Sequence, residues 1–261
     1  MKFNAQAKMK RLYFSAIWIS ALAVLGAEEE TPRQVRFLAV GELPPFRQEI
    51  RDNVRYELEP PEGSIPPREV VLGSGEEKSA ATPLRLGQIS AALKIPPGSG
   101  SLVLRRRDAA DDSDPWLRLT RPENGDFLVL LWRDAKQGTW RQVNSLVLPE
   151  DPVTAASGSV RFVNCADVAV GIKWGAEKLI LEPRNVFKRE LVGGVEQAFQ
   201  VLLPDSAGPP KAIHSGVVTQ NPSERSLVLI YRADGASPRR PVKVSVQREP
   251  VPSPPKKEVL R

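Results

Sequence analysis

The chain contains few side chains of the types that carry out catalysis. It has one histidine, His214, and one cysteine, Cys165. Together they cannot complete a zinc site of His and Cys ligands, and no His-Glu-x-x-His spacing occurs. Ser215 directly follows His214, so in a strand the two side chains point to opposite faces and cannot act as nucleophile and base. We therefore predict no catalytic residues and a chain that is not an enzyme.

Two short glycine motifs, at residues 73–75 and 98–100, are candidates for phosphate binding. Neither is placed to open a helix, so neither can present the helix N-terminal amides that cradle a phosphate. We interpret both as β-turns and predict that the protein has no cofactor.

Four aspartates, Asp108, Asp111, Asp112 and Asp114, gather in one loop. Their carboxylates are the hard oxygen ligands that Ca²⁺ takes. Their spacing does not match an EF-hand, and the arginines at 105–107 can neutralise the loop instead. Blocks of like charge are usually solvated, so we expect no metal here and keep a calcium site in this loop as the alternative.

Large aromatic residues could form a surface on which a carbohydrate stacks. They are Trp116, Trp132, Trp140, Trp174 and Tyr231. Four of the five stand at apolar positions of expected strands, where large rings mostly fill the interior. Trp140 stands near a turn, next to polar residues. We therefore predict that Trp140 is exposed and is the possible ligand surface.

The elements that would position these residues repeat along the chain. The run Leu128–Arg133 recurs as Leu227–Arg232, 99 residues later. Both runs are short, apolar and followed by turn formers, which is typical of a strand buried on both faces. Gly75–Lys78 matches Gly175–Lys178 at a spacing of 100. An internal duplication is the best explanation of a spacing that stays this constant.

The first copy contains about 25 residues that the second copy lacks. Both copies open on Val-Arg-Phe, at Val35 and Val160, so the spacing there is 125. The extra residues fall within 42–67. There, 53–59 alternates between apolar and charged residues, and a pair of prolines stands on each side. Alternation predicts a half-exposed strand and the prolines disfavour a helix. We expect a surface hairpin or flap, added to the first copy only.

Short strands separated by Gly, Pro, Asn and Asp define the fold class. We predict an all-β chain of two tandem antiparallel β-sandwich (immunoglobulin-like) domains that arose by internal duplication. Domain 1 spans 33–149 and domain 2 spans 159–249, with a linker at 150–158 and a disordered tail rich in proline and lysine at 250–261. Within 123–126, an Asn-Gly pair predicts a tight hairpin turn. The expected strands are Val35–Val40, Glu69–Leu72, Arg85–Ile95, Ser101–Arg106, Trp116–Thr120, Phe127–Arg133, Trp140–Leu148, Val160–Asn164, Ala169–Trp174, Lys178–Leu181, Val186–Leu191, Ala198–Leu203, Ala212–Thr219, Ser226–Arg232 and Val242–Arg248.

Residues 1–27 have the pattern of a secretory signal peptide. Four basic residues precede an apolar run from Leu12 to Ala27, and three glutamates follow it. The run is shorter than the ~20 apolar residues that a spanning helix needs. We predict cleavage after Gly26 or Ala27 and export of the chain, with an uncleaved membrane anchor as the alternative.

Removal of that segment leaves an ordinary charge. The whole chain carries +6, and the segment holds four basic and no acidic residues, so the mature chain carries +2. This charge gives little support to binding of nucleic acid, and we predict none. A single cysteine forms no intrachain disulfide, and Cys165 is most simply a small buried strand residue.

These observations predict an exported, non-catalytic binding or structural protein of the cell envelope, in the periplasm or at the cell surface. It would act through the surfaces or edges of its sandwiches, since sheet edges present unpaired backbone groups. Its expected partner is another envelope protein or a cell-surface polymer. The alternative is a carbohydrate-active or other secreted hydrolase that uses carboxylates in an interdomain cleft.

Overall fold

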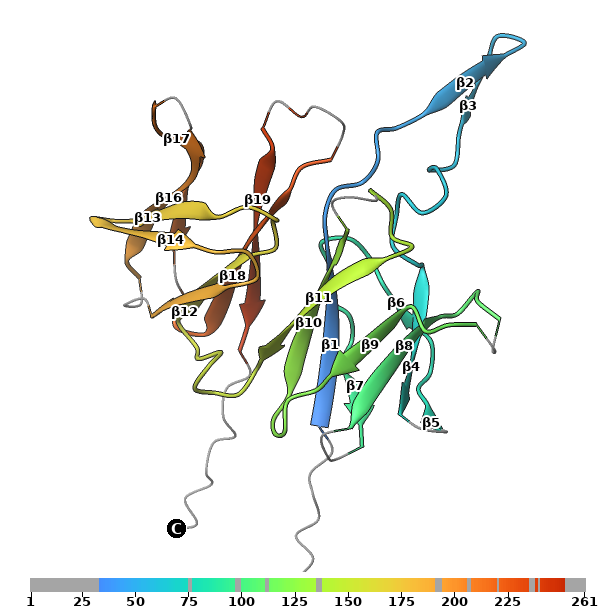
Figure 1. The fold of residues 1–261 in the computed structure, drawn as a ribbon, viewed down its shortest axis with the longest axis horizontal. Helices are drawn as coiled ribbons and strands as arrows, with labels where there is room; N and C mark the ends of the chain where they lie inside the picture. Colours follow the sequence, from blue (N-terminus) through green and yellow to red (C-terminus); the bar gives the residue numbers. More distant parts are fainter. Residues whose placement is uncertain are drawn as a thin grey trace, which may run out of the picture. The chain divides into compact units, whose positions relative to one another are not determined.

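A computed structural model describes residues 33–74, 77–96, 100–110, 113–134, 138–190, 194–205, 208–219, 221–234, 238 and 240–251 (Figure 1). These residues form strands and loops without a helix, which confirms the all-β prediction. Accordingly, no helix in these ranges could cross a membrane. The expected signal segment and residues 252–261 of the expected tail lie outside the described residues. Pro250, predicted to begin the tail, instead ends the last strand.

Two sheets make up the first half of the described chain. One has the strand order β11-β10-β1-β7 and the other β5-β4-β8-β9, with β6 paired to β4. The first sheet comprises β1 (Arg33–Val40), β7 (Leu93–Ile95), β10 (Phe127–Arg133) and β11 (Val143–Pro149). The second comprises β4 (Glu69–Ser74), β5 (Glu77–Lys78), β6 (Thr82–Pro83), β8 (Ser101–Arg106) and β9 (Leu117–Thr120).

The second half also has two sheets, in strand orders β19-β18-β12-β15 and β14-β13-β16-β17. The first comprises β12 (Ser159–Asn164), β15 (Val186–Glu190), β18 (Glu224–Arg232) and β19 (Val242–Pro250). The second comprises β13 (Val170–Trp174), β14 (Glu177–Leu181), β16 (Glu196–Asp205) and β17 (Gly208–Thr219). Strand for strand, these orders correspond to those of the first half.

The sheets are antiparallel as predicted, except for one parallel strand pair in each half. β1 pairs with β10 and β12 pairs with β18 in parallel, whereas every other strand pair in the described residues is antiparallel. The register is the same in both parallel pairs: Arg36 faces Leu128, and Arg161 faces Leu227. Each parallel pair joins strands far apart in the chain, so no hairpin turn fixes their relative direction.

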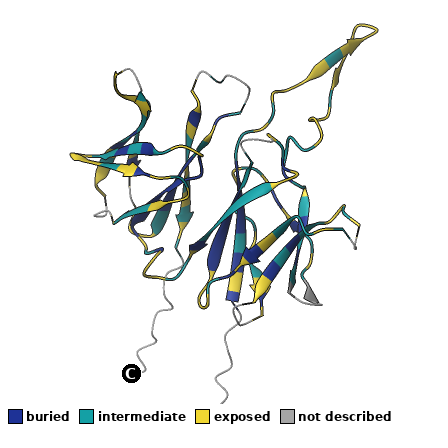
Figure 2. Cartoon of the chain, in the orientation of Figure 1, coloured by how far each residue is buried: buried dark blue, intermediate teal, exposed yellow. Residues whose placement is uncertain are grey.

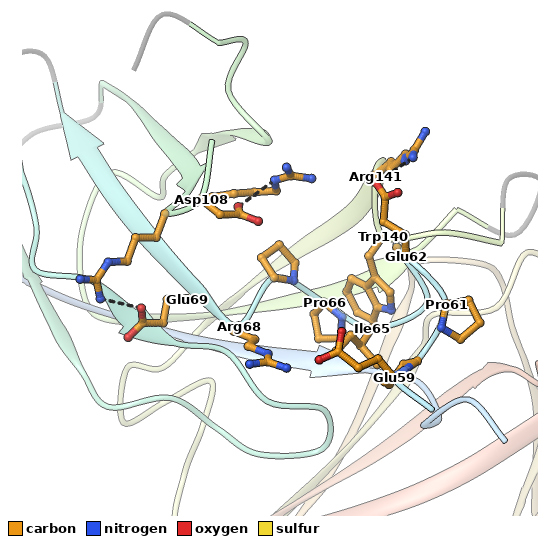
Figure 3. Close-up of a pocket in the computed structure, with 15 residues that line it drawn as sticks. Glu59, Pro61, Glu62, Ile65, Pro66, Arg68, Glu69, Asp108, Trp140 and Arg141 are labelled. Carbon is orange, nitrogen blue, oxygen red and sulfur yellow. Dashed lines mark hydrogen bonds and ion pairs between the residues drawn. The ribbon is translucent and has the colours of Figure 1, made fainter. Parts of the chain in front are cut away.

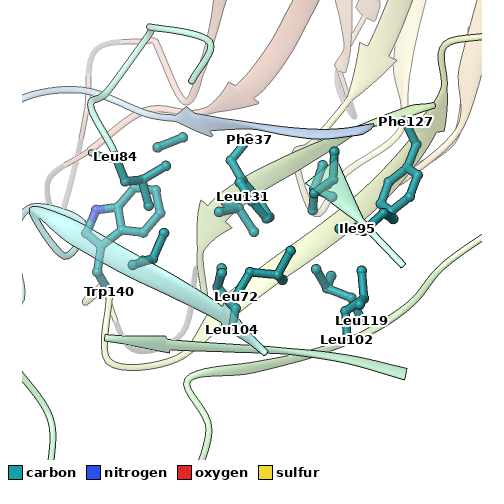
Figure 4. Packing of buried hydrophobic residues seen from close by; sticks show 14 residues of the cluster. Phe37, Leu72, Leu84, Ile95, Leu102, Leu104, Leu119, Phe127, Leu131 and Trp140 are labelled. Carbon is teal, nitrogen blue, oxygen red and sulfur yellow. The ribbon is translucent and has the colours of Figure 1, made fainter. Parts of the chain in front are cut away.

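Each half has its own core, built from the inward residues of both of its sheets. In the first half, Phe37 of β1 and Leu131 of β10 pack in one cluster with Leu72 and Leu104 of the other sheet (Figure 4). Val35 and Val129 belong to the same cluster. Phe162 occupies the corresponding place in the second half, where its ring contacts Trp174 and Phe199 edge to face. Buried residues follow these strands in Figure 2.

A third apolar cluster joins the two halves. It contains Leu38, Val40, Leu128, Leu130 and Leu148 from the first half and Val163, Cys165, Leu227 and Leu229 from the second. β10 and β18 are therefore buried on both faces, which confirms the prediction from their unbroken apolar runs. Cys165 is buried as predicted, and burial raises the pKa of its thiol to about 12.

The Asn-Gly pair at 124–125 does not form the predicted hairpin turn. β9 and β10, which flank it, belong to different sheets, so the loop crosses from one layer to the other. Gly125 has a φ of 75°. Hydrogen bonds from two residues of β1 fix the position of the loop. Arg33 donates from Nε to the Gly125 carbonyl oxygen at 2.8 Å, and the Gln34 amide donates to Asp126 Oδ1 at 2.7 Å.

Candidate binding site: the insertion at 42–67

The extra residues of the first half form the predicted surface hairpin. β2 (Gln48–Arg51) and β3 (Val54–Glu57) pair antiparallel with each other and with no other described strand. Asp52 and Asn53 connect them at positive φ, 50° and 60°, as a primed two-residue turn requires. The pairing continues one step further, because the Leu58 amide donates to the Arg47 carbonyl oxygen at 3.0 Å. In Figure 1 the hairpin extends away from the sheets of the first half.

The insertion exposes several large apolar side chains. The exposed fractions are 73% for Leu43, 69% for Phe46, 60% for Ile50, 50% for Val54 and 49% for Tyr56. No comparable run of exposed apolar residues occurs elsewhere in the ranges that the structure describes, and β2 and β3 are largely exposed in Figure 2. An exposed apolar group of this kind marks an interaction surface more often than scattered single residues do.

Charged residues alternate with these apolar ones on both strands. The register pairs Ile50 with Arg55 on one face and Glu49 with Tyr56 on the other. Arg51 and Glu49 form an exposed ion pair at 2.7 Å, which contributes little to stability. Each face of the hairpin is therefore mixed, and neither packs on a core.

A cavity of about 650 Å³ lies at the base of the insertion (Figure 3). Its charged walls are largely paired with each other. Arg107 binds Glu69 at 2.6 Å, Arg141 binds Glu62 at 2.8 Å, and Arg106 binds Asp108 at 3.2 Å. The lining residues are Glu59, Pro60, Pro61, Glu62, Gly63, Ile65, Pro66, Pro67, Arg68, Glu69, Arg106, Arg107, Asp108, Trp140 and Arg141.

Trp140 is buried, so the prediction that it is an exposed stacking surface was wrong. Its exposed fraction is 2%, and it closes one end of the first core, beside Leu84 (Figure 4). The insertion covers it: the Trp140 amide donates to the Gly63 carbonyl oxygen at 2.7 Å, and Ile65 and Pro66 lie beside the ring (Figure 3). Trp140 Nε1 finds no hydrogen-bond acceptor among the described residues. The polar residues next to Trp140 in the sequence suggested that it is exposed. The segment that covers its ring lies far away in the sequence, so the local pattern could not reveal its burial.

The aspartate loop is only partly described. Asp108 pairs with Arg106 at the cavity edge, Asp114 is exposed, and Asp111 and Asp112 lie outside the described residues. The residues that the structure does describe contain no group of three His, Cys, Asp or Glu side chains arranged to hold a metal.

His214 lies half-buried on β17, with its ring 5.5 Å from that of Phe199. Burial lowers the pKa of the imidazole, and the charge of Arg240 lowers it further. Ser215 accepts a hydrogen bond from Gln200 Nε2 at 3.2 Å. This side-chain environment is that of a packed strand histidine.

Two carboxylates, Glu150 and Glu249, lie between the halves, where the hydrolase alternative would need them. Both are bound by arginines. Arg36 Nη2 donates to Glu150 Oε2 at 2.7 Å, and Arg225 Nη2 donates to Glu150 at 2.8 Å and to Glu249 at 2.9 Å. Arg36 also contacts Glu249. The arginines thus neutralise the charges of both carboxylates and occupy their hydrogen-bonding positions. The cluster of arginines and glutamates connects the two halves. Sequence inspection missed it because its members are separated by up to 213 residues.

The sequence and fold were compared with those of known proteins. No protein-family model matches the chain, and no curated protein matches it. Among solved structures, the Bacillus anthracis TIE protein is similar at 9% sequence identity and a TM-score of 0.23, over 83% of this chain and 43% of that chain. The chain thus spans less than half the length of that structure, and a likeness of this size supports no conclusion about fold or function.

Proposed function

We propose that this chain is an exported, non-catalytic binding protein of the cell envelope and that its insertion at 42–67 carries the contact with its partner. The observation that carries the proposal is the group of exposed apolar side chains at Leu43, Phe46, Ile50, Val54 and Tyr56. A two-stranded hairpin is at best marginally stable alone in water, and it gains stability when a partner covers it. Its free edges also offer the backbone groups through which strand addition works.

The remainder of the chain would serve as a rigid support. We propose that its two halves are copies of one immunoglobulin-like sandwich domain, to which the insertion was added in the first copy. The corresponding strand orders support this proposal, and so does the shared register of the two parallel pairs. The insertion starts from this support: Glu42 binds Lys243 of β19 and accepts a hydrogen bond from the Asp234 amide at 3.3 Å.

Export is supported by the signal-like pattern of residues 1–27. It would bring the insertion into contact with another envelope protein or a cell-surface polymer. Fractionation of cells that produce the full chain tests this part: we expect the chain, shortened by its first 26 or 27 residues, in the envelope or the medium. Recovery of the unshortened chain in the cytoplasm would contradict export.

Site-specific photo-crosslinking tests the contact. A benzophenone amino acid replaces Phe46 in the full chain, and in a matched control it replaces Ile180, which is equally exposed at 71% but lies on β14 of the other half. After irradiation of intact cells, we expect a crosslinked product from position 46 and none from position 180. Equal crosslinking at both positions, or none at either, would overturn the proposed role of the insertion.

A further inference from the structure

The outer edge of β3 has free backbone groups at known positions. In an antiparallel pair, hydrogen-bonded and non-hydrogen-bonded residue pairs alternate. The Leu58 amide donates to the Arg47 carbonyl oxygen, so Leu58 and Arg47 are a hydrogen-bonded pair. Tyr56 stands two residues before Leu58, so it also belongs to a hydrogen-bonded pair, and its backbone groups point inward to Glu49 of β2. The amides and carbonyls of Arg55 and Glu57 therefore point outward. No other described strand pairs with this edge.

The side chains along this edge are self-complementary. If a second copy of β3 is placed antiparallel about a twofold axis, three registers bring the outward backbone groups together. Two of them set Arg55 opposite Arg55 or Glu57 opposite Glu57, and like charges directly opposite are destabilising. The third is centred on Tyr56 and sets Arg55 opposite Glu57 of the second copy, twice by symmetry. Within β3, which ends at Glu57, charge thus favours the register centred on Tyr56.

The same register aligns apolar side chains on the other face. Tyr56 of one copy faces Tyr56 of the other, and Val54 faces Leu58. Val54 and Tyr56 are half-exposed in the single chain, and Leu58 is partly buried, so the pairing would remove apolar area from water. Arg55 and Glu57 form the backbone-bonded pairs, which give four inter-chain hydrogen bonds in all.

From this we propose that the partner of the insertion is a second copy of this chain, joined through the edges of the two β3 strands into a four-stranded sheet. The inference rests on the proposed binding role of the insertion and names its partner. The edge of β2 is a weaker candidate for the same contact. The outward backbone groups of β2 belong to Gln48 and Ile50. A register centred on Glu49 joins them but sets Glu49 opposite Glu49, whereas one centred on Ile50 sets Gln48 opposite Asp52, whose φ of 50° is not extended.

Charge reversal tests the register. Sedimentation over a range of protein concentrations should show that the mature chain self-associates. Arg55→Glu and Glu57→Arg should each weaken this association at least about tenfold, because each sets like charges opposite in both symmetric pairs. An equimolar mixture of the two variants, and the double variant Arg55→Glu/Glu57→Arg, should associate as the parent chain does. Arg85→Glu, at an exposed arginine outside the insertion, is the matched control and should change nothing.

Disulfide trapping locates the contact. In a Cys165→Ala background, Tyr56→Cys should form a disulfide-linked dimer under mild oxidation, because residues facing each other in a non-hydrogen-bonded pair have Cα atoms about 4.5 Å apart. Arg55→Cys reports a register centred on residue 55, Ile50→Cys reports the β2 edge, and Ile180→Cys measures random collision. We expect rapid dimer formation from position 56 alone.

A chain that stays monomeric at every concentration would overturn the inference, as would trapping at position 50 or 55 in preference to 56. Failure of the two charge variants to associate with each other would do the same. These results differ from a failure of the proposed function. If position 46 crosslinks to a different protein while the chain stays monomeric, the insertion still binds a partner, and only the self-pairing is wrong.

Discussion

Replacing Glu150 by glutamine should destabilise the fold strongly, because this residue holds the charge cluster between the halves. Its side chain is 5% exposed and accepts hydrogen bonds from Arg36 and Arg225, and Arg161 Nη2 lies 3.9 Å away. Burial lowers the pKa of Arg161 to about 10, and the charge of Glu150 is the main influence that opposes this decrease. Glutamine keeps the size of the side chain and removes only its charge.

The expected loss is large compared with that at a surface pair. One ion pair at about 4 Å and an effective dielectric constant near 20 has a gross energy of about 4 kcal/mol. Removing one partner of a buried pair typically costs about 3–5 kcal/mol, because it leaves uncompensated charge in the interior. With Glu150 neutral, Glu249 remains bound to Arg36 and Arg225, and Arg161 loses the main charge that opposes the lowering of its pKa. We therefore expect Glu150→Gln to lower the free energy of unfolding by about 3–5 kcal/mol.

Urea denaturation of the mature chain, followed by tryptophan fluorescence, measures this loss. The matched control is Glu62→Gln, which removes the same charge from the exposed pair with Arg141 and should cost less than about 1 kcal/mol. If Glu150→Gln costs no more than this control, the cluster does not stabilise the fold and the electrostatic reasoning fails. A change in the slope of unfolding against urea would indicate that the two halves had begun to unfold separately.

Three further predictions concern single buried or half-buried residues. The thiol of Cys165, with its pKa raised to about 12, should react with a thiol reagent at pH 8 only after urea unfolds the chain; fast labelling of the folded protein would contradict its burial. Trp140→Ala should lower the free energy of unfolding by about 3–5 kcal/mol in urea, since it empties one end of the first core, whereas a loss below about 1 kcal/mol would mean that the insertion does not cover that residue. The pKa of His214 is lowered, so the folded state favours the neutral imidazole ring. This preference stabilises the fold at neutral pH, and the stabilisation is lost as pH falls below the ordinary value of 6.5 and through the lowered folded-state pKa. NMR titration should give a midpoint below 6.5, and His214→Gln should flatten the loss of stability in that range; a midpoint at or above 6.5 would refute this.

The sequence alone predicted most of the strands closely, because the signal for a strand lies within the strand. Of the strand expected at Arg85–Ile95, only β7 (Leu93–Ile95) formed. Ser101–Arg106 and Phe127–Arg133 have the predicted limits, since turn-forming residues and the change from apolar to polar residues mark their ends locally. The proline pairs and alternating pattern of the insertion likewise predicted a hairpin at 42–67. The burial of Cys165 followed from the apolar run before it, although the residue lies just after the end of β12 and not within the strand. Each of these properties depends on residues a few positions apart.

Only the tertiary structure decided which distant segments meet. It made β1 and β10 parallel, turned the Asn-Gly loop into a crossing between sheets and placed the insertion over Trp140. It also brought Arg36, Glu150 and Glu249 together between the halves. A local pattern states whether a side chain prefers to be buried, but the atoms that bury it come from elsewhere in the chain. Contacts between residues that are far apart in sequence therefore required the fold.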